Sequence, residues 1–288
     1  RALPIGVPKV MVSTMASGNV SQYVGTSDVV MFPSVVDAEG LNEISMRIFS
    51  NAVNAVAGMV ENRIDIPDSG KPLLAATMFG VTTPCIKTAK EYLESQGYEV
   101  LVFHATGAGG KSMEALINAG FIKGVLDITT TEWCDELYGG VLNAGPDRLE
   151  AAGKKGIPQV VSVGALDMVN FGPWDTVPEQ YKGRNLYPHN PTVTLMRTTI
   201  EENRGLGKVI AEKLSMAKGP TALMLPLGGV SAIDAPGQPF YGPEEDAALF
   251  EELRRGIGPN VELVEMQNNV NDDDFALAAA KKLIELMK

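Results

Sequence analysis

Residues 73–120 read LLAATMFGVTTPCIKTAKEYLESQGYEVLVFHATGAGGKSMEALINAG, and two short apolar runs in this stretch alternate with two helical patterns. The runs Leu73–Met78 and Glu99–His104 are apolar almost throughout, which is typical of parallel strands covered on both faces. Helices are expected over 84–96 and 111–119, and a glycine follows each of them. This order indicates an open parallel sheet with helices on both faces.

The same alternation extends in both directions along the chain. Further strands are expected at Lys9–Ser13, Asp28–Phe32, Gly124–Ile128, Gln159–Ser162, Ala222–Leu225 and Glu262–Met266. Further helices are expected at 41–61, 147–155, 199–217, 243–256 and 272–287. The most linker-like stretch is 62–70, NRIDIPDSG, so two domains are expected, 1–68 and 69–288. Because the chain opens abruptly into a strand pattern, the first domain is expected to be completed by a segment upstream.

Composition excludes several classes of function. The 288 residues carry 24 basic and 35 acidic side chains, a net charge of −11, which disfavours general binding of DNA or RNA. No apolar run reaches the ~18 residues that a membrane span needs, so no membrane association is expected. The two cysteines, Cys85 and Cys134, allow at most one disulfide and favour a reducing, cytoplasmic location.

The loop after the strand at 99–104 is the first candidate binding site. Its glycines allow backbone N–H groups to turn inward, and the following helix presents its positive end, an arrangement that suits a phosphate or carboxylate. The stretch differs from the phosphate-loop pattern G-x-x-x-x-G-K-S only at Ala105. The alternative is a tight turn without a ligand. The candidate residues are Thr106, Gly107, Gly109, Gly110, Lys111 and Ser112.

Two other loops are rich in glycine or hydroxyl residues. Gly228 and Gly229 follow an apolar run and permit close approach of a ligand, but they also suit a bulge or the crossing of a neighbouring loop. Near the start of the chain, hydroxyl groups flank a strand, where they either grip a ligand or cap helices. The candidates there are Ser13, Thr14, Gly25, Thr26 and Asp28.

Catalytic candidates are few. His104 ends a strand against the glycine loop, and His189 lies in the proline-flanked stretch YPHNP; either is an acid–base candidate or a structural hydrogen-bonding group. Arg197 is a candidate clamp for a substrate carboxylate. With only two histidines and no paired-cysteine spacing, no metal site is expected.

Four stretches carry a family resemblance: Leu3–Gly18 (LPIGVPKVMVSTMASG), Tyr23–Asp28, Phe103–Glu114 and Asn185–Pro191. Together they resemble the Tm-one-like ATP-binding protein family. The resemblance implies two Rossmann-like three-layer α/β domains with mostly parallel sheets, the first incomplete in this chain. It also implies nucleotide binding and a homodimer.

Three hypotheses about function follow. The leading one is that ATP, with or without Mg²⁺, or a similar small anionic ligand lies between two α/β domains, with Asp28 near a ribose hydroxyl or a metal-bound water. The second is an enzyme acting on a small carboxylate or keto acid by C–C cleavage or acyl transfer, with a histidine as the acid–base group. The third is a non-catalytic interaction module whose ligand stabilises a dimer.

Overall fold

The computed structural model describes residues 2–65 and 69–288, and the chain divides into two compact units, Arg1–Ser69 and Gly70–Lys288. The boundary expected between residues 68 and 69 adjoins residues 66–68, which lie outside the described residues. Parallel strands and helices alternate along both units, so the predicted α/β fold class is confirmed.

Unit 1 contains two parallel strands, β1 (Val10–Ser13) and β2 (Val30–Pro33). A 3-10 helix, Thr14–Ser17, and the single-turn helix α1 (Ser21–Val24) lie between them in sequence. Helix α2 (Glu43–Glu61) follows and packs against β1. It begins with a capping box, in which the side chains of Asn42 and Ser45 each accept the other residue's backbone N–H.

The apolar stripe predicted on α2 is only partly covered. Ala52 is buried, whereas Ile48 and Val56 are half-buried. Toward the two ends of the helix, Ile44 and Val60 are exposed by 47% and 59%. Within the described part of unit 1, the stripe is therefore covered best along the middle of the helix.

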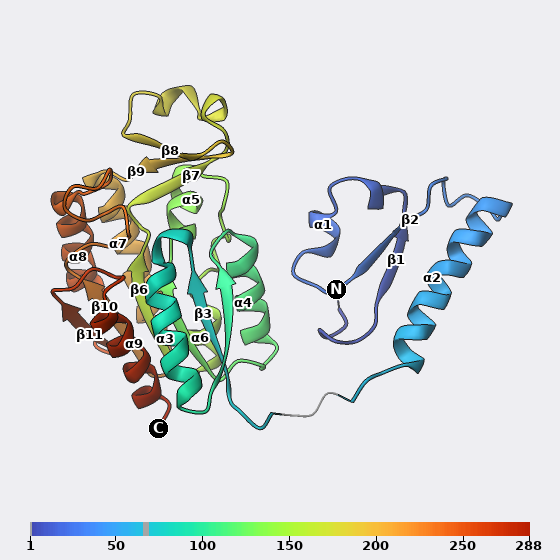
Figure 1. Ribbon diagram of the computed structural model, residues 1–288, viewed down its shortest axis with the longest axis horizontal. Coiled ribbons are helices and arrows are strands. Elements are labelled where there is room, and N and C mark those ends of the chain that lie inside the picture. Colours follow the sequence, from blue (N-terminus) through green and yellow to red (C-terminus); the bar gives the residue numbers. More distant parts are fainter. Residues whose placement is uncertain (1, 66–68) are drawn as a thin grey trace. The chain divides into compact units, whose positions relative to one another are not determined.

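Unit 2 is built on a six-stranded parallel sheet with the order β11-β10-β6-β5-β3-β4 (Figure 1). The strands are β3 (Leu73–Met78), β4 (Glu99–His104), β5 (Gly124–Thr129), β6 (Gln159–Gly164), β10 (Thr221–Pro226) and β11 (Val261–Met266). The helices are α3 (Thr83–Ser95), α4 (Ala108–Asn118), α5 (Glu132–Tyr138), α6 (Ala151–Lys155), α7 (Ile200–Ser215), α8 (Pro243–Gly256) and α9 (Asp273–Leu286).

The helices form layers on both faces of this sheet. On one face, Leu74 and Leu126 pack with buried residues of α3 and α9. On the other face, Ala75 and Val125 pack with α4 and α6, and Leu223 packs with α7 and α8. Successive strand residues point to opposite faces, and both faces are buried, which explains why the strand sequences are apolar almost throughout.

A second sheet was not expected. Strands β7 (Met168–Phe171), β8 (Leu186–Asn190) and β9 (Val193–Arg197) form an antiparallel sheet with the order β7-β9-β8. Figure 1 shows it beyond the carboxyl ends of the parallel strands. The prolines of residues 187–191 indicate only an extended path before 192–199, because the pairing of β7 with β9 joins residues 23 to 29 positions apart.

Two helix predictions need correction, and one helix was not predicted. Helix α4 begins at Ala108 rather than 111, so the glycine loop forms its first turn. The helix expected over 147–155 is shorter, since Leu149 adopts a φ of 71°, which α-helical backbone does not permit. The seven-residue helix α5 was not predicted, and its first turn carries the buried acids Glu132 and Asp135.

Candidate functional site

The carboxyl ends of the parallel strands meet at one edge of the sheet in unit 2. From β3 the chain crosses to β4, returns past β3 to β5, and then continues in the opposite direction to β6, β10 and β11. The order therefore reverses between β3 and β5. In open α/β sheets, ligands bind at the carboxyl edge beside such a reversal.

The glycine loop lies at this edge, but its amides do not converge on open space. Gly107 (φ +81°) caps helix α4. The N–H groups of Gly107 and Gly110 both donate to Oε1 of Glu132, at 2.7 and 3.0 Å. The predicted anion cradle is therefore filled by the protein's own carboxylate, and it does not fit a phosphate group. The expectation of an open cradle was wrong because sequence spacing cannot reveal a partner 22 to 25 residues away.

Glu132 belongs to a closed ionic network under helix α4. The Nε of Arg148 donates to Oε2 of Glu132 at 2.6 Å, and its two terminal nitrogens donate to Asp127 at 2.5 and 2.7 Å. Oε1 of Glu114 lies 3.5 Å from Arg148. Burial alone would lower the pKa of Arg148, but the charges of Asp127 and Glu132 raise it well above its usual value. Burial also raises the pKa of Glu114, and this effect is larger than the lowering by the positive charge of Arg148.

Packing explains why three glycines stand in this loop. A Cβ atom on Gly109 would overlap the carbonyl oxygen of His104, and one on Gly110 would overlap the carboxylate of Glu132. A Cβ on Gly107 would lie 2.5 Å from the carbonyl oxygen of Asn143. Close contact with the protein's own atoms therefore explains the three glycines without a ligand.

The polar candidates of this loop lie around the network rather than inside it. The hydroxyl of Thr106 donates to the carbonyl of His104 at 3.2 Å. Lys111 is exposed near the start of α4, and Ser112 is half-buried. The His104 ring is exposed at the end of β4, with its centroid 5.4 Å from that of Phe79. His104 and Lys111 are thus exposed basic side chains at this edge.

The candidates in unit 1 have partners within that unit or stand exposed. Ser13 caps the 3-10 helix by accepting the N–H of Met15 at 3.1 Å. Of the two roles expected for these hydroxyl groups, ligand binding or helix capping, Ser13 has the capping role. Asp28 forms an ion pair with Lys9 and accepts the N–H of Gly6 at 2.9 Å. These two hydrogen bonds lower the pKa of Asp28. Gly25 (φ +59°) ends α1, and Thr14 and Thr26 are exposed.

A neighbouring loop crosses the loop of Gly228 and Gly229. This crossing is one of the interpretations that the sequence left open. The N–H of Gly228 donates to the carbonyl of Asn268 at 2.9 Å, and a Cβ on Gly228 would lie 2.7 Å from the same carbonyl carbon. Gly229 has a φ of +125°, and a Cβ there would overlap the carbonyl oxygen of Asp234. Both glycines are required by the contact with residues 268–269 and 234.

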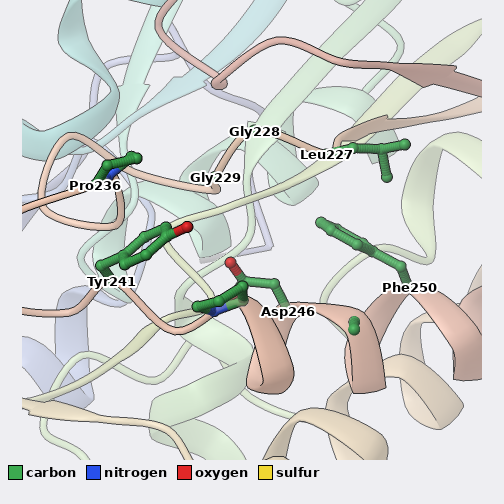
Figure 2. A pocket seen from close by; sticks show the side chains of 9 residues that line it. Leu227, Gly228, Gly229, Pro236, Tyr241, Asp246 and Phe250 are labelled. Carbon is green, nitrogen blue, oxygen red and sulfur yellow. The ribbon is translucent and has the colours of Figure 1, made fainter.

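The same two glycines line a pocket of about 250 Å³ between the loop after β10 and helix α8. Figure 2 shows the Tyr241 hydroxyl and an Asp246 oxygen pointing toward one space, with the Phe250 ring entering from the other side. The lining residues are Leu227, Gly228, Gly229, Pro236, Tyr241, Pro243, Asp246, Ala247 and Phe250. Sequence reasoning recognised the start of α8 but could not distinguish Asp246 from an ordinary helix-start acid.

Arg197 is not among the residues that line this pocket, but it contacts Asp246, and each of its three guanidinium nitrogens donates to an acceptor of the protein. Its guanidinium donates to Asp246 Oδ1 at 2.8 Å, to the carbonyls of Phe240 and Gly242 at 2.8 and 3.1 Å, and to the hydroxyl of Thr198 at 3.1 Å. Arg197 does clamp a carboxylate, but the carboxylate is that of Asp246. The structure does not join it to either histidine, since His104 ends β4 and His189 is an exposed residue of β8.

Three buried aspartates surround Arg197. Asp234 accepts the N–H groups of Val230 and Gly242 at 2.8 and 3.2 Å. Asp167 accepts the hydroxyl of Ser231 at 2.8 Å, while its Oδ1 is buried without a hydrogen-bond partner among the described residues. Burial, followed by the charge of Asp234, raises the pKa of Asp167 to about 7 and that of Asp246 to about 8.

Residues 2–65 and 69–288 contain neither a metal-ligand cluster nor a membrane-spanning helix. No group of three or more histidine, cysteine, aspartate or glutamate side chains there has an arrangement that could hold a metal ion. None of the helices in the same residues combines the length and apolar character needed to cross a bilayer.

Comparison with known proteins identifies the family. Residues 1–65 match the N-terminal domain, and residues 71–287 the C-terminal domain, of an uncharacterised protein family, UPF0261. The chain belongs to the UPF0261 family. Within it, a UPF0261 protein of Clostridium tetani is 64% identical over 289 residues, covering 100% of this chain and 72% of that protein. A UPF0261 protein of Mesorhizobium japonicum is 51% identical, covering 97% and 70%.

The family extends to plants. The ToMV resistance protein Tm-1(GCR237) of Solanum lycopersicum is 49% identical over 293 residues, which cover 99% of this chain but only 39% of the tomato protein. The susceptible form tm-1(GCR26) is 48% identical over the same length. The resemblance stated from the four sequence stretches is thereby confirmed.

Proposed function

We propose that this UPF0261 chain binds a small anionic ligand, a nucleotide such as ATP, at the carboxyl edge of the parallel sheet in unit 2. The observation that carries the proposal is the reversal of strand order between β3 and β5. In parallel α/β sheets this edge is where phosphate-bearing ligands bind, since the loops and helix starts there direct N–H groups outward. ATP is the nucleotide to test because the family resemblance implies it.

The filled cradle changes where the phosphates are proposed to lie. The Glu132 carboxylate occupies the amides of Gly107 and Gly110 and would repel a phosphate there. The groups proposed to contact the anion are instead the exposed Lys111 and His104 side chains on the outside of the same edge. Mg²⁺ would enter with the nucleotide, since the described residues offer no preformed metal cluster of their own.

The test is calorimetric titration of the full chain with ATP, with and without Mg²⁺. We expect saturable binding that the Lys111→Ala variant weakens by about tenfold, a loss of ~1.4 kcal/mol. Lys155→Ala is the matched control, because Lys155 is also exposed but lies at the end of α6, which leads to the amino end of β6. No binding at millimolar ATP, or equal weakening by both variants, would exclude the proposal.

The homodimer also remains a proposal. Sedimentation of the full chain with and without ATP tests it, and a dimer that ATP stabilises is the expected result. The tomato relatives are named for resistance and susceptibility to ToMV, which we do not extend to this chain. No contact brings His104 or His189 together with Arg197, so the hypothesis of a histidine acid–base enzyme gains no support from the geometry.

A further inference from the structure

The pocket beside helix α8 has features that the nucleotide proposal does not use. Its volume of about 250 Å³ suits a molecule with one ring and a short side chain, below the usual range for drug-sized ligands. Leu227 and Phe250 supply apolar surface, and Tyr241, exposed by 49%, stands at the mouth. Asp246 is a polar group directed into it (Figure 2).

The hydrogen-bond inventory of the pocket argues against an anionic ligand. The N–H groups of Leu227, Gly228 and Gly229 donate to the carbonyls of Met266, Asn268 and Pro226, at 2.8, 2.9 and 3.2 Å. Each guanidinium nitrogen of Arg197 already donates to a protein acceptor. Among the described lining residues, the Tyr241 hydroxyl is the side-chain donor left for a ligand, because the carboxyl proton of Asp246 is engaged in its hydrogen bond with Asp234. A carboxylate or phosphate would therefore lack the donors that compensate its desolvation.

The charge balance favours a cation instead. Three carboxyl groups, Asp167, Asp234 and Asp246, face the single guanidinium of Arg197. Asp234 accepts two backbone N–H groups and shares a side-chain hydrogen bond with Asp246. A positively charged ligand would favour the ionised form of Asp246. The aromatic rings of Tyr241 and Phe250 add the surface on which ammonium groups bind favourably.

We propose that this pocket binds a small organic amine, with the ammonium group donating to Asp246 and the apolar part packed against Leu227 and Phe250. The proposal is independent of nucleotide binding, since it involves neither Lys111 nor His104. It assigns Asp246 the role of ligand contact and Arg197, held by Phe240 and Gly242, the role of positioning the Asp246 carboxyl.

The binding must depend on pH. At neutral pH, burial keeps a proton on Asp246, whose pKa is raised to about 8, and Asp234, Asp167 and Arg197 are the ionisable groups that face it. Glu245 also lies near Arg197, because a Cβ atom added to Gly242 would overlap both the Glu245 carboxylate and the Arg197 guanidinium. An ammonium ligand displaces the proton of Asp246. Amine binding near pH 7 should therefore release a proton and strengthen as the pH rises toward 8.

The experiment titrates the full chain with benzylamine, benzyl alcohol and benzoate, which share a ring and differ in charge. Benzylamine should bind saturably at millimolar concentration, more tightly than the other two by about tenfold. Titrations in buffers of different ionisation enthalpy should detect the released proton at about pH 7. Benzyl alcohol or benzoate binding as tightly as benzylamine, or no saturable binding of benzylamine, would overturn the proposal.

Two variants locate the site without disturbing the buried charges. Ala247→Leu should fill the pocket from α8 and weaken benzylamine binding by about tenfold. Glu251→Leu places the same side chain one turn farther along α8, outside the lining residues, and should leave binding unchanged. Asp246→Asn should abolish proton release. Binding that survives Ala247→Leu, or proton release that survives Asp246→Asn, would also overturn the proposal.

Discussion

The guanidinium of Arg148 donates from Nε to Oε2 of Glu132 over 2.6 Å, with both side chains almost completely buried. The other carboxylate oxygen of Glu132 accepts two backbone N–H groups at the start of α4. One acidic side chain thus joins α4, α5 and the segment before α6. Burying an ion pair of this kind costs a large desolvation energy, which is offset only when both groups also have their remaining hydrogen bonds satisfied.

Glu132→Ala should destabilise the chain strongly. It leaves Arg148 with one carboxylate fewer and removes the acceptor of Gly107 and Gly110, which we expect to lower the free energy of unfolding by about 3–5 kcal/mol. Urea denaturation followed by circular dichroism measures the change. Glu91→Ala, on the exposed side of α3, is the control and should stay within about 0.5 kcal/mol of the wild type. Similar losses in both variants would contradict the structural role of Glu132.

Gly109→Ala should destabilise the fold and not merely weaken the binding of a ligand. The added Cβ overlaps the carbonyl oxygen of His104, and backbone cannot move aside cheaply, so a loss of about 1–3 kcal/mol is expected. Gly80→Ala is the matched comparison at the same edge, because its Cβ would meet open space and its φ is not positive. A melting temperature unchanged by Gly109→Ala would show that the loop can adapt.

The Asp246 carboxyl should make the chain less stable as the pH rises. Burial raises the pKa of Asp246 from 3.8 to about 8 in the folded state. Between these values the unfolded chain loses the proton and the folded chain retains it, so rising pH favours unfolding by up to ~1.4 kcal/mol per pH unit. Below pH 3.8 both states are protonated and the effect vanishes.

Asp246→Asn lacks this dependence. We therefore expect the variant to gain stability relative to the wild type as the pH rises from about 4 to about 8, whatever its absolute stability. Urea denaturation of both proteins at several pH values measures the difference. Asp175→Asn, at an exposed position, should show no such trend. A difference between wild type and Asp246→Asn that is constant with pH would show that Asp246 is ionised in the folded chain.

Both thiols should be unreactive until the chain unfolds. Burial raises the pKa of Cys85 to about 12 and that of Cys134 well above its usual value, so few thiolates form at neutral pH. Iodoacetamide at about pH 8 should leave the native chain unmodified and should modify both thiols in urea. Rapid modification of Cys85 in the native chain would show that α3 opens readily from the sheet.

The sequence predicted the strands of unit 2 closely, and the reason is local. The runs 73–78 and 99–104 match β3 and β4 residue for residue, since a strand buried on both faces must be apolar at consecutive positions. The start of α8 at Pro243 was also recognised, because proline and acids at a helix start interact with the backbone of that turn alone. The antiparallel sheet and α5 were not predicted, because their residues interact with residues that are distant in the sequence.

By itself, then, the sequence established the parallel α/β class and the family, because periodicity and motif order are properties of neighbouring residues. The glycine loop after β4 was correctly located but wrongly interpreted as an open cradle. Only the tertiary structure decided that Glu132 fills it and that Asp246 lines a pocket. Hydrogen bonds to buried carboxylates are satisfied by whichever donor the fold brings within about 3 Å, however far apart the two lie along the chain.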